Sequence, residues 1–152
     1  MTSIRSLSAA GNEASEGQQK NPGPQAADQF QFKDEEGGKG ITKDGKTFSF
    51  HSYSSGDGVK LLTYIEDFAS MELAKRALDE KVRQASSVGA RGPKLDKNGK
   101  PIGERVVLTE EKKTQDQAES QNFICWTTGS TLHWIQSKSL KHALAFEKTL
   151  DP

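Results

Sequence analysis

The sequence predicts an α+β fold: a mostly antiparallel sheet of five or six strands with two helices on one face, in the order ββαββββα. Three observations predict it. Apolar residues alternate over 47–53, as in a strand with one buried face, and recur every three or four positions over 71–85, as in an amphipathic helix. The pairs Asp44-Gly45, Asn98-Gly99 and Gly129-Ser130 lie between such segments, and they favour the tight turns that join antiparallel strands.

The N-terminal residues 1–38 are expected to form a disordered polar arm ahead of a single domain over 39–152. The arm is rich in Gly, Ser and Gln and contains few apolar residues. The free energy gained by burying so little apolar surface does not offset the entropic cost of ordering the backbone, which is roughly 1–2 kcal/mol per residue. The chain of 152 residues suits one domain. A partner-binding motif or an export signal within the arm stays open.

Two strands are expected before the first helix. In 47–53, the alternation places Phe48 and Phe50 on one face. The segment 59–65 carries apolar residues on both sides, with Leu62 and Tyr64 sharing one of them. The second strand is therefore apolar on both faces.

Two helices are expected, at 71–85 and at 140–148. Ser70 offers an N-cap to the first, and Glu72 lies in its first turn, where the helix dipole favours an acid. Ser137 or Ser139 caps the second. The apolar stripe of the first helix consists of Met71, Ala74, Leu78, Val82 and Ala85.

Four strands are expected between the helices. A turn at Asn98-Gly99 leads into a strand at 105–109, and strands at 122–128 and 131–136 form the clearest hairpin. Residues 110–121 are almost wholly polar, with only Ala118 to bury. We therefore expect a mobile loop there rather than a helix packed on the core.

The last hairpin is expected to have two apolar faces. With Gly129 and Ser130 as the central turn residues, Thr128 lies opposite Thr131, and successive side chains alternate between faces. One face then holds Phe123, Cys125, Leu132 and Trp134. The other holds Ile124, Trp126, His133 and Ile135, with Trp126 opposite His133.

Two helices on one face would leave the second face of the sheet uncovered, and exposed aromatic patches commonly mark interfaces. We interpret the protein as a non-enzymatic protein-binding or adaptor domain whose partner is another protein or a second copy of itself. Shelter of this face by the arm, by the 110–121 loop or by curling of the sheet stays an open alternative. The expected binding residues are Trp126, His133, Ile124 and Ile135, extended by Tyr64 and Leu62 if their strand lies in the same sheet.

Two other function classes are alternatives. A small enzyme would use Cys125 or a histidine, but the hairpin register points Cys125 and His133 to opposite faces, so no catalytic residue is predicted. Weak nucleic-acid binding would use the basic hairpin 91–105, and a formal net charge of zero argues against it. The cations of that hairpin are Arg91, Lys94, Lys97, Lys100 and Arg105.

Composition and motifs exclude several further classes. A single cysteine forms neither an internal disulfide nor a multi-cysteine metal site, and the three histidines lack ligand spacing, so no metal or cofactor is expected. No glycine motif for phosphate binding occurs. No apolar run is long enough for a membrane span or a Sec signal core, which predicts a cytoplasmic protein; export by another route stays open.

Overall fold

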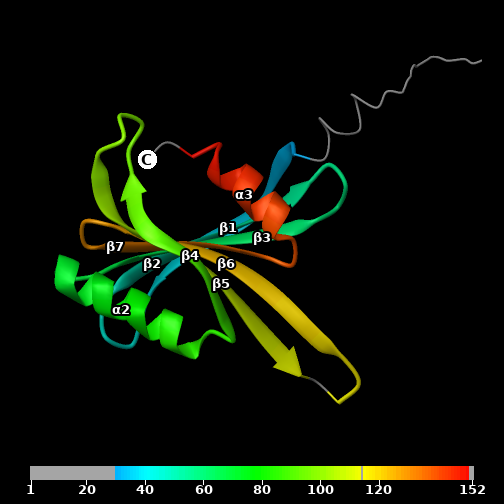
Figure 1. Ribbon diagram of the computed structural model, residues 1–152, viewed down its shortest axis with the longest axis horizontal. Coiled ribbons are helices and arrows are strands. Elements are labelled where there is room, and N and C mark those ends of the chain that lie inside the picture. Colours follow the sequence, from blue (N-terminus) through cyan, green and yellow to red (C-terminus); the bar gives the residue numbers. More distant parts are fainter. Residues whose placement is uncertain (1–29, 114, 151–152) are drawn as a thin grey trace, which may run out of the picture. The chain divides into compact units, whose positions relative to one another are not determined.

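The computed structural model describes residues 30–113 and 115–150 (Figure 1). Within them, seven strands and two helices follow in the order β1-β2-β3-α2-β4-β5-β6-β7-α3. The strands are β1 (Phe32–Ile41), β2 (Thr47–Ser55), β3 (Lys60–Asp67), β4 (Ser87–Leu95), β5 (Pro101–Lys113), β6 (Ala118–Thr128) and β7 (Thr131–Ser137). The helices are α2 (Met71–Gln84) and α3 (Leu140–Glu147).

The described residues divide into two units. The first comprises residues 34–54 and 59–150 and contains the hydrophobic core and both helices. Of the second unit, the structure describes residues 30–33 and 55–58. There, the N–H of Gly58 donates to the carbonyl oxygen of Ser55 at 3.0 Å.

The strands form one sheet in the order β1-β2-β3-β7-β6-β5-β4. Each pair from β2 to β4 in this order is antiparallel. The predicted α+β class with an antiparallel sheet and two helices is therefore confirmed. The described residues contain seven strands instead of five or six, because β1 precedes the first strand that the apolar alternation marks.

β1 corrects the expected boundary of the polar arm at residue 38. Residues 32–38 lie in a strand next to β2, although they include almost no apolar side chain. Backbone hydrogen bonding to β2 replaces apolar burial here. In addition, β1 glycines leave room for rings of β2, since a Cβ on Gly40 would lie 2.8 Å from the Phe48 ring. Residues 1–29 of the predicted arm lie outside the described residues.

The prediction that residues 110–121 form a mobile loop is also wrong at both ends of that segment. β5 continues to Lys113 and β6 begins at Ala118, with these two residues opposite each other. The antiparallel ladder extends outward from the buried pair Leu108 and Phe123, so each added residue gains backbone hydrogen bonds without needing an apolar side chain. Residue 114 lies outside the described residues.

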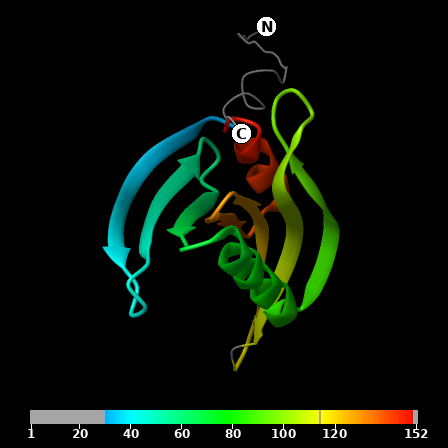
Figure 2. The ribbon, with the colours of Figure 1, turned by 90° about the vertical axis from the view of Figure 1, so that its left-hand side faces the viewer.

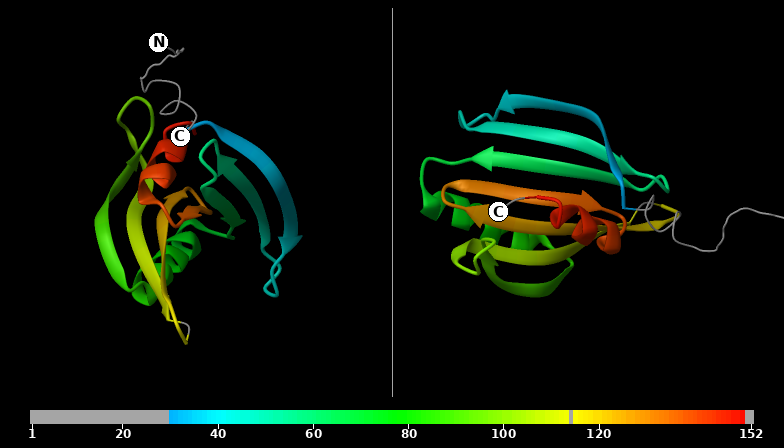
Figure 3. Two further views of the ribbon diagram at one scale, coloured as in Figure 1. Left: turned by 90° about the vertical axis from the view of Figure 1, so that its right-hand side faces the viewer. Right: turned by 90° about the horizontal axis from the view of Figure 1, so that it is seen from above.

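The two helices pack on opposite faces of the sheet, so the prediction that they share one face is wrong. Leu78 of α2 packs with Val106 and Cys125, whereas Glu147 of α3 bonds to Arg105, whose side chain points to the other face because neighbouring residues alternate. Figure 3 shows α3 in front of the central strands and α2 behind them. We call these sides of the sheet the α2 face and the α3 face.

The N-cap residues of both helices are among those predicted. The hydroxyl of Ser70 accepts a hydrogen bond from the N–H of Leu73 at 3.2 Å, and that of Ser139 accepts one from the N–H of His142 at 3.2 Å. The core beneath α2 contains six buried residues: Leu78, Val106, Leu108, Phe123, Cys125 and Leu132.

Gly103 in β5 lies against the backbone of β6, and its replacement by alanine tests how tightly this pair is packed. The added Cβ would overlap the carbonyl oxygen of Thr127, which cannot move without displacing the strand. We expect Gly103→Ala to lower the free energy of unfolding by about 1–3 kcal/mol, measured by urea denaturation. Gly92→Ala on β4 is the control, since its Cβ would meet nothing within 4 Å. Equal effects of the two variants would contradict this account.

Candidate functional site

The final hairpin has the predicted register. Thr128 lies opposite Thr131, and Trp126 lies opposite His133. Gly129 has a φ of 58°, which a residue with a side chain rarely adopts in such a turn. The rings of Trp126 and His133 stack at 5.1 Å between centroids with only 5° between their planes. The turn chemistry therefore sets which side chains share a face.

Helix α3 covers most of the surface that the sequence predicted to be open. Trp126 is only 6% exposed, and Ile124 and Ile135 are completely buried. Ala143 and Phe146 of α3, which packs on β6 and β7, are buried as well. The structure therefore corrects the expectation that Trp126, Ile124 and Ile135 are exposed: they form a second core.

A cluster of three charged side chains holds α3 on the sheet. The two carboxylate oxygens of Glu147 each accept a hydrogen bond from Arg105 at 2.7 Å, and Lys94 Nζ lies 3.4 Å from the same carboxylate. Lys94 Nζ is also 4.8 Å from the centre of the Trp126 ring. Burial alone would raise the pKa of Glu147, but hydrogen bonding and the charges of Arg105 and Lys94 outweigh it and lower that pKa.

His133 lies at the margin of the area that α3 covers. Its ring is partly buried, and its Nε2 lies 2.8 Å from Thr128 Oγ1. Burial, followed by the charge of Lys94, lowers the pKa of His133, whereas Asp67 opposes this shift. Across the sheet, His133 is opposite Ile65 of β3, which is exposed. The α3 face therefore continues beyond the helix onto β3.

Leu62 and Tyr64 lie on the α2 face and do not extend the surface around Trp126. Tyr64 is opposite Trp134, and its ring is stacked between Trp134 at 4.1 Å and Phe48 at 5.7 Å between centroids. Its hydroxyl donates to Glu66 at 3.0 Å. Burial, together with that hydrogen bond and the Glu66 charge, raises the pKa of Tyr64 to about 12. Their strand does lie in the same sheet, as the prediction required, but these two side chains point to the face opposite that of Trp126.

Among the described residues, the part of the α3 face beyond the helix contains two adjacent hollows on β1, β2 and β3. Their volumes are about 500 Å³ and 440 Å³, and both are lined by Lys39, Ser49 and Ile65. Together they follow β2 from Thr47 to Tyr53, and we call them the β1–β3 trough. Figures 2 and 3 show β1 and β2 at one edge of the sheet. At one end of β2, the Tyr53 ring lies 4.6 Å from that of Phe146 of α3 between centroids.

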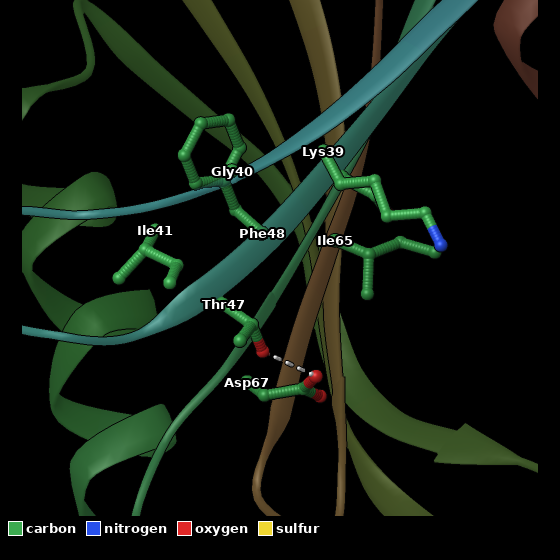
Figure 4. A pocket seen from close by; sticks show the side chains of 8 residues that line it. Lys39, Gly40, Ile41, Thr47, Phe48, Ile65 and Asp67 are labelled. Carbon is green, nitrogen blue, oxygen red and sulfur yellow. Dashed lines mark hydrogen bonds between the residues drawn. The ribbon is translucent and has the colours of Figure 1, made fainter.

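The polar groups of the trough are unevenly distributed. At one end, Asp67 accepts hydrogen bonds from the hydroxyls of Thr47 at 3.1 Å and Thr131 at 2.9 Å. At the other end, His51 bonds to Asp34. Figure 4 shows the first hollow, with Lys39 and Ile65 extending to the same side. A cation and an exposed apolar side chain thus lie between two ends that already carry bonded carboxylates.

Lys39 and Ile65 are not among the binding residues that the sequence predicts. The alternation in β3 places the side chains of Ile65 and Tyr64 on opposite faces of the sheet. Only the pairing of β3 with β7 shows that Ile65 is the one that shares a face with His133. No turn joins β3 to β7, so no local signal sets that register.

The arrangement around Cys125 does not provide a nucleophile. The thiol is completely buried, and burial raises its pKa to about 12, an effect that Lys81 opposes. Cys125 is opposite Trp134, and the adjacent pair Trp126 and His133 points to the other face. Among residues 30–113 and 115–150, no three His, Cys, Asp or Glu side chains are grouped as metal ligands.

The predicted basic hairpin is largely neutralised. Arg91 bonds to Glu104 at 2.6 Å and to Asp79 at 2.8 Å, while Lys94 and Arg105 share Glu147. Of the five cations, Lys97 and Lys100 remain for phosphate contacts. The stacked Tyr64 ring also has both faces covered, which leaves no free platform there for a nucleic-acid base.

Over the described ranges, no helix has the length and apolar character needed to cross a membrane.

The buried state of Cys125 predicts its reactivity. We expect the thiol to react with a small disulfide reagent at neutral pH only at the rate of unfolding, because the reagent reaches the sulfur only in opened molecules. The measurement compares thiol release in native protein and in urea. Rapid stoichiometric reaction of the native protein would contradict the buried geometry and restore a catalytic thiol.

The Glu147 cluster predicts a pH-dependent contribution to stability. Because the folded-state pKa of Glu147 lies below its unfolded value, this contribution is present above the unfolded pKa and is lost as the pH falls through the folded pKa. We expect Glu147→Gln to cost about 2 kcal/mol in the free energy of unfolding at neutral pH and progressively less in acid. Urea denaturation across pH measures both curves. The exposed Glu72→Gln on α2 is the control, and a pH-independent cost would contradict the assignment.

Comparison with known proteins supplies no relative. No protein-family model, curated protein or solved structure matches the chain. The function of the protein is therefore inferred from its own structure.

Proposed function

We propose that the protein is a small, non-enzymatic binding module that holds a partner protein in the β1–β3 trough. The observation that carries the proposal is the pair of adjacent hollows on β1, β2 and β3, which begin at Tyr53 beside Phe146 of α3 and extend away from that helix to Thr47. The proposal retains the α3 face as the binding face but transfers the contact from Trp126 to Ile65 and its neighbours. It also retains the expectation of a cytoplasmic protein.

The lining of the trough supports protein binding. Ile65 is 39% exposed in its centre, and serine, threonine and charged side chains surround it. An apolar centre with a polar margin is the usual composition of a protein interface. β1 is also the terminal strand of the sheet in the described part of the chain, and extended segments commonly bind at terminal strands.

A peptide selection tests the proposal. Short random peptides displayed on phage are selected on the full chain, and their affinities are measured by fluorescence anisotropy. We expect Ile65→Ser to weaken binding of the selected peptides by about tenfold, equivalent to about 1.4 kcal/mol, because it removes the central apolar contact. Val88→Ser is the matched control, since Val88 is 48% exposed in edge strand β4, outside the trough.

Two outcomes decide the result. If peptides are selected but none depends on Ile65, or if Val88→Ser weakens them equally, the trough is not the binding site. Sedimentation equilibrium identifies the partner class: a dimer that Ile65→Ser dissociates would identify the partner as a second copy of the chain, and a monomer would indicate a different protein.

A further inference from the structure

Building on the proposed function, we propose that the trough selects an extended peptide segment in which acidic and apolar residues alternate. A carboxylate of the segment pairs with Lys39, and an apolar side chain beside it covers Ile65. The partner class is thus an acidic, partly apolar peptide segment of another protein.

Lys39 is the first reason for this choice. On the α2 face of these strands, the described cations have carboxylate partners: Lys46 lies 3.9 Å from Glu66, and Lys60 lies 2.8 Å from Glu35. Lys39 lines both hollows and has no such partner among the described residues. A ligand carboxylate would therefore find a free ammonium group at the centre of the trough.

The alignment of the strands is the second reason. Ser49 is opposite Ile65 in the β2–β3 pairing. A Cβ on Gly38 would meet the Phe50 ring and one on Gly40 the Phe48 ring, which places Lys39 beside Ser49 in the same row across the strands. Figure 4 shows the side chains of Lys39 and Ile65 extending to the same side. A carboxylate over Lys39 and an apolar group over Ile65 therefore belong to the same short stretch of ligand.

The carboxylates at the two ends restrict where the acidic side chain fits. Asp67 is two residues from Ile65 along β3, roughly 7 Å away at the usual strand rise, and Asp34 lies at the His51 end. Each of these aspartates repels a ligand carboxylate placed at its own end of the trough. The row of Lys39 is thus the position where a negative charge is favoured.

A charge-reversal experiment tests the inference. The probes are fluorescein-labelled peptides of about eight residues, enough to follow β2 from Thr47 to Tyr53, that alternate leucine with glutamate, glutamine or lysine. By anisotropy, we expect the full chain to bind the glutamate peptide about fivefold more tightly than the glutamine peptide and to bind the lysine peptide least. Lys39→Glu should reverse this order.

Lys97→Glu makes the same charge change at an exposed turn of the β4–β5 hairpin and should retain the original order. Urea midpoints of both variants verify that the fold is kept. Equal binding of the three peptides that Ile65→Ser still weakens would overturn the acidic preference and leave the proposed function standing. If the alternating peptides do not bind but the phage-selected peptides do, and their binding depends on Ile65, the acidic preference fails and the proposed function stands. If no peptide of either kind depends on Ile65, both proposals fail.

Discussion

The contact between Glu147 and Arg105 decides which part of the sheet is available for binding. The carboxylate is only 12% exposed and is bonded through both oxygens, with Lys94 beside it. A carboxylate buried to this extent is stable only with such partners, so the cluster fixes the position of α3 over Trp126. Because α3 is held there, the apolar residues of β6 and β7 form a core, and the exposed Ile65 of β3 lies beyond the helix.

The register of the final hairpin was predictable because a two-residue turn leaves little freedom. Once Gly129 and Ser130 occupy the turn, the pairing of Trp126 with His133 follows, and so does the separation of Cys125 from His133. The side of the sheet on which α3 packs was not predictable in the same way. The residues that hold it, Glu147 and Arg105, are 42 positions apart, and nothing in either local pattern indicates their contact.

The strands that the sequence did not reveal are held by backbone pairing. β1 and the outer parts of β5 and β6 have few apolar residues, and apolar periodicity is the signal from which strands are recognised. A polar strand becomes favourable only once a neighbouring strand offers its unpaired N–H and C=O groups. Lys112 opposite Glu119 adds a charge pair, but only the long hairpin brings these residues together. The trough on β1 to β3 was missed for the same reason.

A neutral protein can still recognise a charged segment if its own charges are mostly paired. With 21 basic and 21 acidic residues, the chain has no net field to attract an anion from a distance. On the α2 face of the same strands, Lys46 and Lys60 are each paired with a carboxylate, so their fields largely cancel within a few ångströms. The field of Lys39 therefore dominates at short range, within the Debye length of about 8 Å at physiological salt. Such a site selects its ligand by position of charge and by apolar contact together, and association gains little from electrostatic steering.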